Sequence, residues 1–255
     1  MRDKPNSPQL SPQPSKGWVI LATDTGVGKT LIGCALAETL RAQGACVRVR
    51  KPVETGCAED EEELVPADAI ALWQAAGKIE PLETVCPLRF RAALAAPQAA
   101  AIEGKTLKFQ RDIAPHLPFA HSPAACLTGN QNQHEYWIIE SAGGVLSPLT
   151  DDTLNCELAR YTRLPVLLVA PDKLGTLSGL FSAIEALHQR NIPLVGIILN
   201  QCSEAPNTPT ETLLNNQALL QEWLPRLMPS VPPPDIFVVR YNDSALDLAN
   251  RLIAQ

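Results

Sequence analysis

The chain has 255 residues, of which 45% are hydrophobic and 19% are charged, as expected for a folded protein with one large or two small α/β domains. Its formal net charge of −6 argues against broad nucleic-acid binding, which needs a basic face. No apolar run approaches the ~18 residues of a membrane helix, and no secretory signal pattern is present. We therefore expect a cytoplasmic protein that contacts neither membranes nor nucleic acids, and whose seven cysteines are reduced thiols.

The first 16 residues contain four prolines and almost no apolar side chains, which predicts a disordered tail ahead of a single domain over residues 17–255. That domain begins with an apolar run from Trp18 to Leu21. The sequence Ala-Thr-Asp-Thr-Gly-Val-Gly-Lys-Thr follows at 22–30, and an amphipathic stretch runs from Leu31 to Leu40. This order is typical of a strand, a tight glycine loop and a helix.

The glycine loop has the chemistry of a polyphosphate site. Backbone N–H groups of such a loop point at one spot, and the helix behind it favours anions through its unpaired donors and its dipole. Lys29 adds a mobile cation, and Thr30 offers a hydroxyl that suits Mg²⁺. Thr23 stands where the usual motif has its first glycine, so a purely structural strand-to-helix turn is the alternative. The flanking strand and helix favour a nucleotide site.

Apolar runs farther along the chain predict buried strands at 47–53, 136–139, 165–170, 194–199 and 236–240. Helical patterns alternate with them at 68–76, 155–161, 176–189, 211–223 and 244–254. Continuous apolar strands separated by helices predict an α/β fold of three layers, with a mainly parallel central sheet and helices on both faces. Residues 86–135 are interpreted as an excursion of the same domain, with an alanine-rich helix from Ala92 to Ala101 that Pro97 interrupts.

Polar residues at the ends of these strands are the candidates for ligand binding, because open α/β sheets bind ligands at the carboxyl ends of their strands. Lys51 lies in the second predicted strand, where we favour a phosphate-facing lysine over an edge-strand lysine that faces water. Thr55 and Gly56 form a polar turn that could bond a substrate. Glu140 ends the third strand and suits Mg²⁺, with a surface carboxylate as the alternative.

Three further candidates carry weaker signals. Asp68 is a first-turn acid of its helix, and it becomes a metal candidate only if residues 57–67 fold back over the phosphates. Residues 173–176 lead into a helix whose free N–H groups could hold a carboxylate, although a plain connection is about as compatible. Asn200 follows a strand and could read the edge of a base or simply form a turn.

Taken together, these segments resemble the dethiobiotin synthetases, ATP-dependent cyclo-ligases that close the ureido ring in biotin synthesis. The pieces that carry the resemblance are Thr23 to Thr30, Lys51-Pro52-Val53 with Thr55-Gly56, Asp68-Ala69, Glu140 with Ala142-Gly143-Gly144, Leu149 to Asp151, Pro165-Val166, Lys173-Leu174-Gly175 and Gly196 to Asn200. The resemblance implies a homodimeric P-loop NTPase-like fold. It also implies the substrates 7,8-diaminononanoate, CO₂ and ATP, with Mg²⁺ as the cofactor.

The resemblance also implies roles for individual residues. Lys29 and Lys51 would be catalytic, over the transferring phosphate, and Thr30, Asp68 and Glu140 would hold Mg²⁺. The implied ATP-binding residues are Thr25, Gly26, Val27, Gly28, Lys29, Thr30, Leu31, Glu140, Ser141, Ala142, Gly143, Asn200 and Gln201. The implied substrate-binding residues are Thr25, Lys51 and Thr55, together with Gly175, Thr176, Leu177 and Ser178, which would hold the substrate carboxylate across the dimer interface.

The chain departs from the family pattern at several positions. Ala22 and Ser141 stand where the family usually has glycine, Gly26 replaces a frequent acidic residue, and Gln201 replaces an aspartate. The alternatives are a partitioning-type switch ATPase and a degenerate homologue that binds nucleotide without ring closure. The first needs a signature lysine at the position of Asp24. A corrin-type amidotransferase synthase would need a further glutaminase domain, for which the chain leaves no room.

Overall fold

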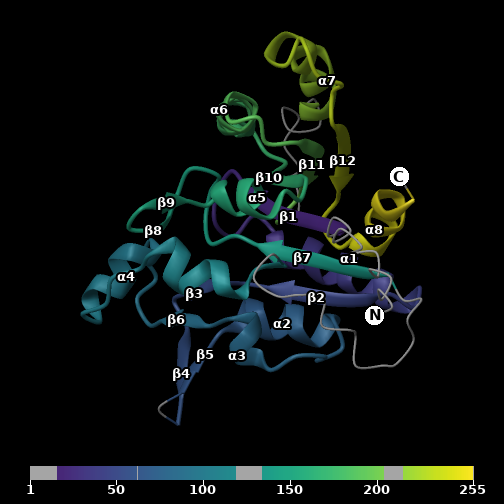
Figure 1. The fold of residues 1–255 in the computed structure, drawn as a ribbon. Helices are drawn as coiled ribbons and strands as arrows, with labels where there is room; N and C mark the ends of the chain where they lie inside the picture. Colours follow the sequence, from purple (N-terminus) through teal and green to yellow (C-terminus); the bar gives the residue numbers. More distant parts are fainter. Residues whose placement is uncertain (1–15, 62, 119–133, 204–214, 255) are drawn as a thin grey trace, which may run out of the picture.

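The computed structural model describes residues 16–61, 63–118, 134–203 and 215–254. Its centre is a parallel sheet of six strands in the order β12-β11-β10-β1-β7-β2 (Figure 1). Their bounds are β1 Lys16–Ala22, β2 Cys46–Arg50, β7 Glu135–Glu140, β10 Val166–Pro171, β11 Leu194–Asn200 and β12 Asp235–Val239. The predicted tail lies outside the described residues, except for Lys16, which is the first residue of β1.

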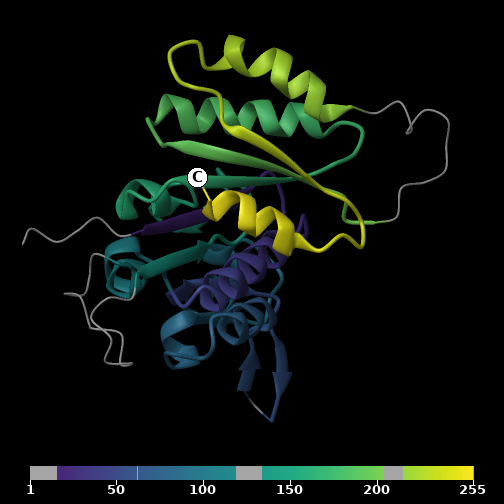
Figure 2. The same ribbon diagram turned by 90° about the vertical axis from the view of Figure 1, so that its right-hand side faces the viewer.

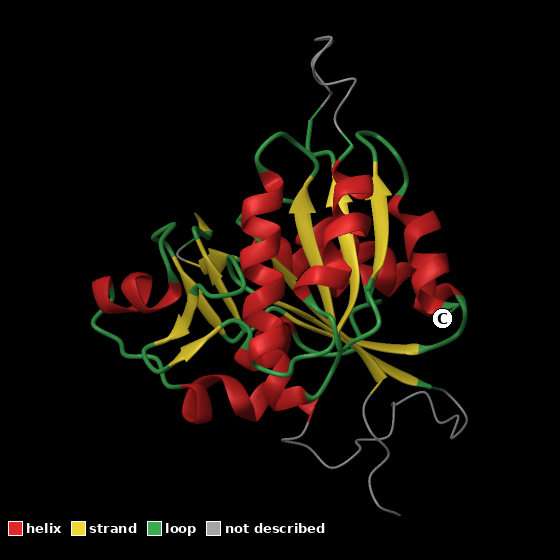
Figure 3. Cartoon of the chain, turned by 90° about the horizontal axis from the view of Figure 1, so that it is seen from above, coloured by secondary structure: helices red, strands yellow, loops and turns green. Residues whose placement is uncertain are grey.

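Helices cover both faces of the sheet, so the predicted three-layer α/β fold is confirmed (Figure 3). One face packs against α1 (Lys29–Ala42), α2 (Ala67–Ala75) and α8 (Ala245–Ile253). The other packs against α5 (Glu157–Thr162), α6 (Thr176–Gln189) and α7 (Asn216–Leu227), and the last two lie side by side (Figure 2). Successive residues of β1 alternate between the two cores, with Ile20 in one and Val19 and Leu21 in the other.

The second predicted strand ends earlier than the apolar pattern indicates. Strand β2 stops at Arg50 because Pro52 has no N–H to donate to a neighbouring strand, while the N–H of Lys51 donates to the Val85 carbonyl. The chain then leaves the main sheet and forms β3 (Val53–Thr55), which pairs with β6 (Leu88–Phe90). Residues 47–53, expected as one strand, are therefore divided between β2 and β3, with Lys51 and Pro52 between the two strands.

Several short elements fall where the sequence indicates loops. They are β4 (Ala58–Asp60), β5 (Glu63–Val65), α3 (Leu82–Val85), the π-helical turn η1 (Phe109–Ile113), the 3-10 turn η2 (Ala114–His116), β8 (Pro148–Thr150) and β9 (Thr153–Leu154). The alanine-rich helix is α4 (Ala96–Ile102), and Pro97 lies in its first turn. The prediction that Pro97 interrupts this helix is wrong, because a first-turn proline lacks only an N–H that would stay unbonded anyway.

Two expectations from composition can be compared with the described residues. No helix there is long and apolar enough to cross a membrane. Five cysteines are free thiols, namely Cys34, Cys57, Cys86, Cys156 and Cys202. Cys46 is disulfide-bonded, so the expectation of reduced thiols is wrong at that residue.

Two arginines of the outer strand β2, Arg48 and Arg50, share Glu80 as their counter-charge. Glu80 accepts two hydrogen bonds from Arg50, at 2.8 and 2.9 Å, and pairs with Arg48 at 2.7 Å. Both guanidinium groups also lie over the ring of Trp137 on the neighbouring strand. Only 3% of the Arg50 side chain is exposed, so its charge depends on Glu80 for compensation.

Replacing Glu80 with glutamine should lower the free energy of unfolding by about 3 kcal/mol, because a buried guanidinium loses its counter-charge. Urea unfolding followed by tryptophan fluorescence measures this loss. Glu222→Gln is the matched control, since Glu222 pairs with Arg226 on the exposed face of α7, where such pairs are worth less than about 1 kcal/mol. Equal losses of unfolding free energy in the two variants would contradict the stabilising role of Glu80 between Arg48 and Arg50.

Candidate functional site

The glycine loop connects β1 to α1 as the sequence predicts. Gly26 and Gly28 have φ values of +68° and +100°, a region that side chains rarely adopt. At Gly28, a Cβ atom would also lie 2.2 Å from the Asn200 amide nitrogen. Glycine is therefore required at 28 both by the backbone and by the neighbouring strand end, and the loop can present its N–H groups without side-chain obstruction.

Lys29 begins α1 and is almost fully buried. Its ammonium donates to the Asp24 carbonyl of the same loop at 3.1 Å. Burial lowers the pKa of Lys29, and repulsion from Lys51 lowers it further, while the nearby carboxylates of Glu140 and Asp68 act in the opposite direction. The two lysines predicted to share a phosphate are thus close enough for their charges to repel each other.

Lys51 stands at the centre of a buried ion cluster. Its side chain is held by carboxylates from two other segments, because the ammonium donates to Glu140 Oε1 and, at 3.1 Å, to Asp68 Oδ2. The hydroxyl of Thr30 donates to the same Glu140 oxygen at 3.0 Å. The structure therefore brings together four residues that the sequence singled out, Thr30, Lys51, Asp68 and Glu140. Asp68 reaches this group from the first turn of α2, whereas the β4–β5 hairpin before that helix is largely exposed.

The opposite charges in this cluster favour each other's ionised forms. Burial alone would lower the pKa of Lys51, which is 4% exposed, but the attraction of Glu140 and Asp68 raises that pKa above its ordinary value. For Asp68, burial acts to raise the pKa, yet the attraction of Lys51 lowers it. Both groups are consequently charged around neutral pH, which is the state in which a buried pair is stable.

One oxygen of the cluster has no partner. Glu140 is fully buried, and its Oε2 atom makes no hydrogen bond. A buried carboxylate oxygen is costly to leave unpaired, so this atom suits a cation bound beside the Thr30 hydroxyl and the half-exposed Asp68. Among the described residues, no group of three or more His, Cys, Asp or Glu side chains is arranged to hold a metal ion. Two carboxylates and a hydroxyl suit Mg²⁺, which retains several waters.

The segment after Glu140 packs directly on the glycine loop. Val145 donates its N–H to the Ala22 carbonyl at 2.9 Å, and a Cβ at Gly144 would lie 3.0 Å from the Thr23 carbonyl oxygen. Ser141, Ala142 and Gly143, predicted to bind ATP, therefore lie beside the loop. Ala22 and Ser141 are both fully buried, so the two departures from glycine are accommodated within the packing.

The shape of this segment depends on a residue that the sequence analysis missed. Asn155 is fully buried, and its side-chain amide donates to the Ala142 carbonyl at 2.7 Å and to the Gly144 carbonyl at 2.9 Å. An asparagine near a helix start resembles an ordinary capping residue in sequence, so no pattern distinguishes this long-range role.

The first turn of α6 lies against the glycine loop. Gly175, with φ of +88°, precedes the helix, which begins at Thr176 and continues through Leu177 and Ser178. The Thr176 hydroxyl is buried without a hydrogen-bond partner. A Cβ at Gly179 would lie 3.7 Å from the Thr23 side chain. The segment predicted to hold the substrate carboxylate is thus a neighbour of the predicted phosphate site.

Other predicted residues lie farther from the ion cluster or face solvent. Thr25 and Gly26 are exposed at the tip of the loop, and Leu31 is exposed on α1. Val27 is buried, and its carbonyl accepts a hydrogen bond from the Asn200 amide at 2.9 Å. Asn200 therefore fixes the glycine loop to the end of β11, a contact that the sequence interpretation as a base reader or turn residue did not include.

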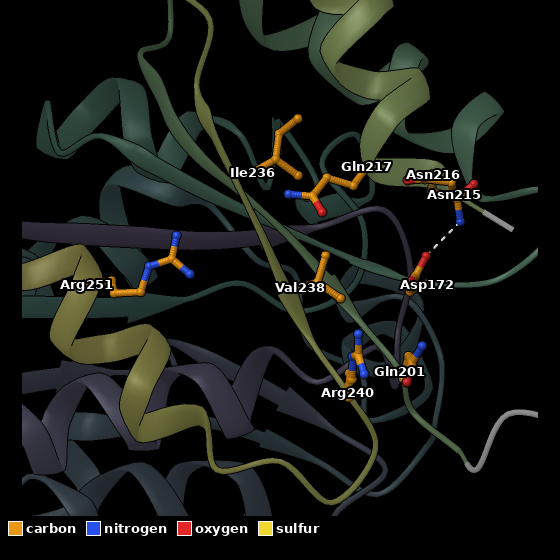
Figure 4. A pocket seen from close by; sticks show the side chains of 9 residues that line it. All are labelled: Asp172, Gln201, Asn215, Asn216, Gln217, Ile236, Val238, Arg240 and Arg251. Atoms are coloured by element: carbon orange, nitrogen blue, oxygen red, sulfur yellow. Dashed lines mark hydrogen bonds between the residues drawn. The ribbon is translucent and has the colours of Figure 1, made fainter.

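Gln201 lines an open pocket of about 600 Å³ that extends along β12 to the carboxyl ends of β10 and β11 (Figure 4). The lining residues are Asp172, Gln201, Asn215, Asn216, Gln217, Ile236, Val238, Arg240 and Arg251. Asp172 accepts a hydrogen bond from Asn216 at 2.7 Å, and Gln201 accepts one from the Tyr241 N–H at 3.3 Å. None of the lysines and carboxylates of the ion cluster lines this pocket.

A family model described as an AAA domain matches residues 16–235. The ATP-dependent dethiobiotin synthetase BioD of Anaeromyxobacter dehalogenans is 38% identical over 196 residues, which is 76% of this chain and 81% of the relative. That of Rhodopirellula baltica is 36% identical, with 81% and 79% covered. A solved nucleotide-binding protein of Archaeoglobus fulgidus, in complex with ADP, aligns with a TM-score of 0.38 and 14% identity over 92% of this chain and 86% of that one.

The sequence relatives distinguish between the families considered from the motifs. At this identity and coverage they leave the partitioning ATPase and the corrin-type synthase without support. The glycine loop, Lys51 and Glu140 all lie inside the matched region. The chain is a member of the dethiobiotin synthetase family, built on a P-loop NTPase-like fold.

Proposed function

We propose that the chain makes dethiobiotin from 7,8-diaminononanoate, CO₂ and ATP, releasing ADP and phosphate. The observation that carries the proposal is the convergence of Lys29, Lys51, Thr30, Glu140 and Asp68 beside an open glycine loop. Such a cluster has the charges needed to hold a triphosphate and to neutralise the phosphoryl group as it moves. The relatives that carry the name dethiobiotin synthetase support this choice of reaction.

The reaction requires the activation of a poor electrophile. One amine of the substrate captures CO₂ as a carbamate, whose negative charge shields its carbon from attack. Transfer of the γ-phosphoryl group to a carbamate oxygen gives a mixed anhydride with phosphate as its leaving group. The second amine then attacks that carbon, closes the five-membered urea and expels phosphate.

The chain contributes position and charge to these steps. Lys29 and Lys51 lie near each other and near the loop, so their ammonium groups can balance the charge on the terminal phosphoryl group. The start of α6, with the unpartnered Thr176 hydroxyl, suits the substrate carboxylate beside the loop. Thr25 and Thr55 would contact substrate, while Asn200 and Gln201 would lie at the adenine end.

Thr30, Asp68 and Glu140 would hold Mg²⁺, in keeping with the unpartnered Glu140 Oε2 atom. When bound, the ion would offset the negative charge of the phosphate oxygens. The enzyme is proposed to act in the cytoplasm as a homodimer with the substrate carboxylate at the interface. Its catalytic unit would be a single domain over residues 17–255.

Purified protein should release phosphate from ATP only when diaminononanoate, bicarbonate and Mg²⁺ are all present, because the carbamate is the phosphoryl acceptor. A coupled phosphate assay, with mass detection of the cyclic urea, checks both products. Phosphate release at the same rate without the diamine would refute the proposed reaction and favour the nucleotide-hydrolysing alternative.

Lys51→Gln should reduce turnover at least about 100-fold, since one charge that stabilises the transferring phosphoryl group is lost. It should also lower the free energy of unfolding by about 3 kcal/mol, because Glu140 keeps its buried charge without the ammonium. Turnover is therefore measured at a temperature where circular dichroism shows the variant folded. Lys105→Gln, at an exposed lysine paired with Glu103, is the control, and equal turnover in the two variants would contradict the role of Lys51.

The stability that Asp68 contributes should depend on pH in a defined direction. Its pKa is lower in the folded protein than in the unfolded chain, so the ionised form is favoured by folding. The contribution is fully present above the pKa of Asp68 in the unfolded chain, about 4, and is lost as the pH falls through the lower pKa of the folded protein. Asp68→Asn should destabilise the protein at pH 7 and do so less at pH 3, as measured by urea unfolding at both values. An equal effect at both would argue against pairing with Lys51.

A further inference from the structure

Glu54 is a buried carboxylate beside the proposed site for which neither motif nor resemblance gives a role. It lies in β3, three residues after Lys51, and is 7% exposed. A glutamate is rarely buried unless its oxygens are satisfied by specific partners. Its partners therefore indicate what the side chain does.

Both oxygens of Glu54 bind the start of helix α2. Oε1 accepts the N–H of Asp68 at 3.0 Å, and Oε2 accepts the N–H of Ala69 at 2.9 Å. The residue before the helix is Pro66, whose side chain makes no capping bond. Glu54 thus supplies, from a distant part of the sequence, the acceptors that a local Ser, Thr, Asp or Asn would ordinarily provide.

The first of these bonds is made to the backbone of Asp68 itself. The carboxylate of Asp68 also accepts a hydrogen bond from Lys51 Nζ, at 3.1 Å. Lys51, Glu54 and Asp68 consequently form a closed ring, in which the short segment of residues 51–54 holds Asp68 at its backbone and at its side chain. The charge of Glu54 is compatible with this place, because a helix N-terminus favours an anion.

We propose that Glu54 is a positioning residue, which fixes the backbone of Asp68 and so sets where the Asp68 carboxylate stands for the divalent cation. The inference rests on the proposed function for the identity of that cation. Glu54 itself touches neither the cation nor the substrate. Its effect should pass entirely through Asp68, and this distinguishes positioning from a general contribution to the fold.

The test measures binding of Mn²⁺, as a probe for Mg²⁺, to the full chain in the presence of ADP, by electron paramagnetic resonance. Glu54→Gln keeps the size of the side chain but replaces one carboxylate oxygen with an NH₂ group. This group cannot accept a hydrogen bond, so it would face the N–H of Asp68 or Ala69 donor to donor. Its Mn²⁺ dissociation constant should rise about tenfold, as is typical when a residue that supports a metal ligand is changed. Asp152→Asn is the matched control, because Asp152 also accepts a backbone N–H, from Phe109 at 3.2 Å, away from the ion cluster. It should leave Mn²⁺ binding unchanged.

A double variant decides whether Asp68 mediates the effect. In an Asp68→Asn background, adding Glu54→Gln should weaken Mn²⁺ binding by less than about twofold, since the group to be positioned is already gone. Independent losses that multiply in the double variant would overturn the proposal, as would unchanged Mn²⁺ binding in the single Glu54→Gln variant. A Glu54→Gln chain that fails to fold would also overturn it, because the carboxylate would then serve the fold alone.

The outcome is separable from that of the proposed reaction. If the wild-type chain forms no dethiobiotin while Glu54→Gln still weakens Mn²⁺ binding through Asp68, the reaction is refuted and the positioning role stands. If dethiobiotin forms and Mn²⁺ binding is insensitive to Glu54, the reaction stands and the positioning role is refuted.

Discussion

The buried pairing of Lys51 with Glu140 is the interaction on which the rest of the site depends. Neither charge could be buried alone, because the cost of desolvation would exceed what the surrounding packing returns. Sheet register brings the two together. Arg50, the last residue of β2, stands level with Ile139 of β7, so the residues that follow these two in the chain are Lys51 and Glu140. On its other side Glu140 stands level with Ile20 of β1, which leads into the glycine loop.

The chain must leave the sheet at this same point. Pro52 ends the pairing of β2, so Lys51 lies at the carboxyl edge with no strand beyond it to occupy the space above the loop. The segment that follows turns away as β3 and returns as α2, which places Asp68 opposite Lys51. A continuous strand to residue 53, as the apolar pattern indicates, would carry the backbone past the loop and leave Asp68 without a route to the cluster.

Residues whose roles are set locally could be predicted from the sequence. The glycine loop, Lys29 and the buried strands were recognisable because periodicity and positive-φ glycines act over a few neighbours. Glu54 and Asn155 were not recognisable, since their partners lie 14–15 and 11–13 positions away in the chain, respectively. The link from Asn200 to the Val27 carbonyl spans 173 positions. Such contacts arise from strand order, which composition and spacing do not encode.

The ion cluster of Lys51, Glu140 and Asp68 also explains how two lysines can be buried beside the glycine loop. Glu140 and Asp68 attract both ammonium groups: their attraction raises the pKa of Lys51 and opposes the lowering of the Lys29 pKa by burial. The oxygens that bind Lys51 belong to the residues proposed to hold Mg²⁺. If a cation shared those oxygens, Lys51 would lose part of its pairing, and a bound phosphate would offer it another partner. In the proposed reaction the same carboxylates would keep Lys51 charged and would leave it able to pair with the transferring phosphoryl group.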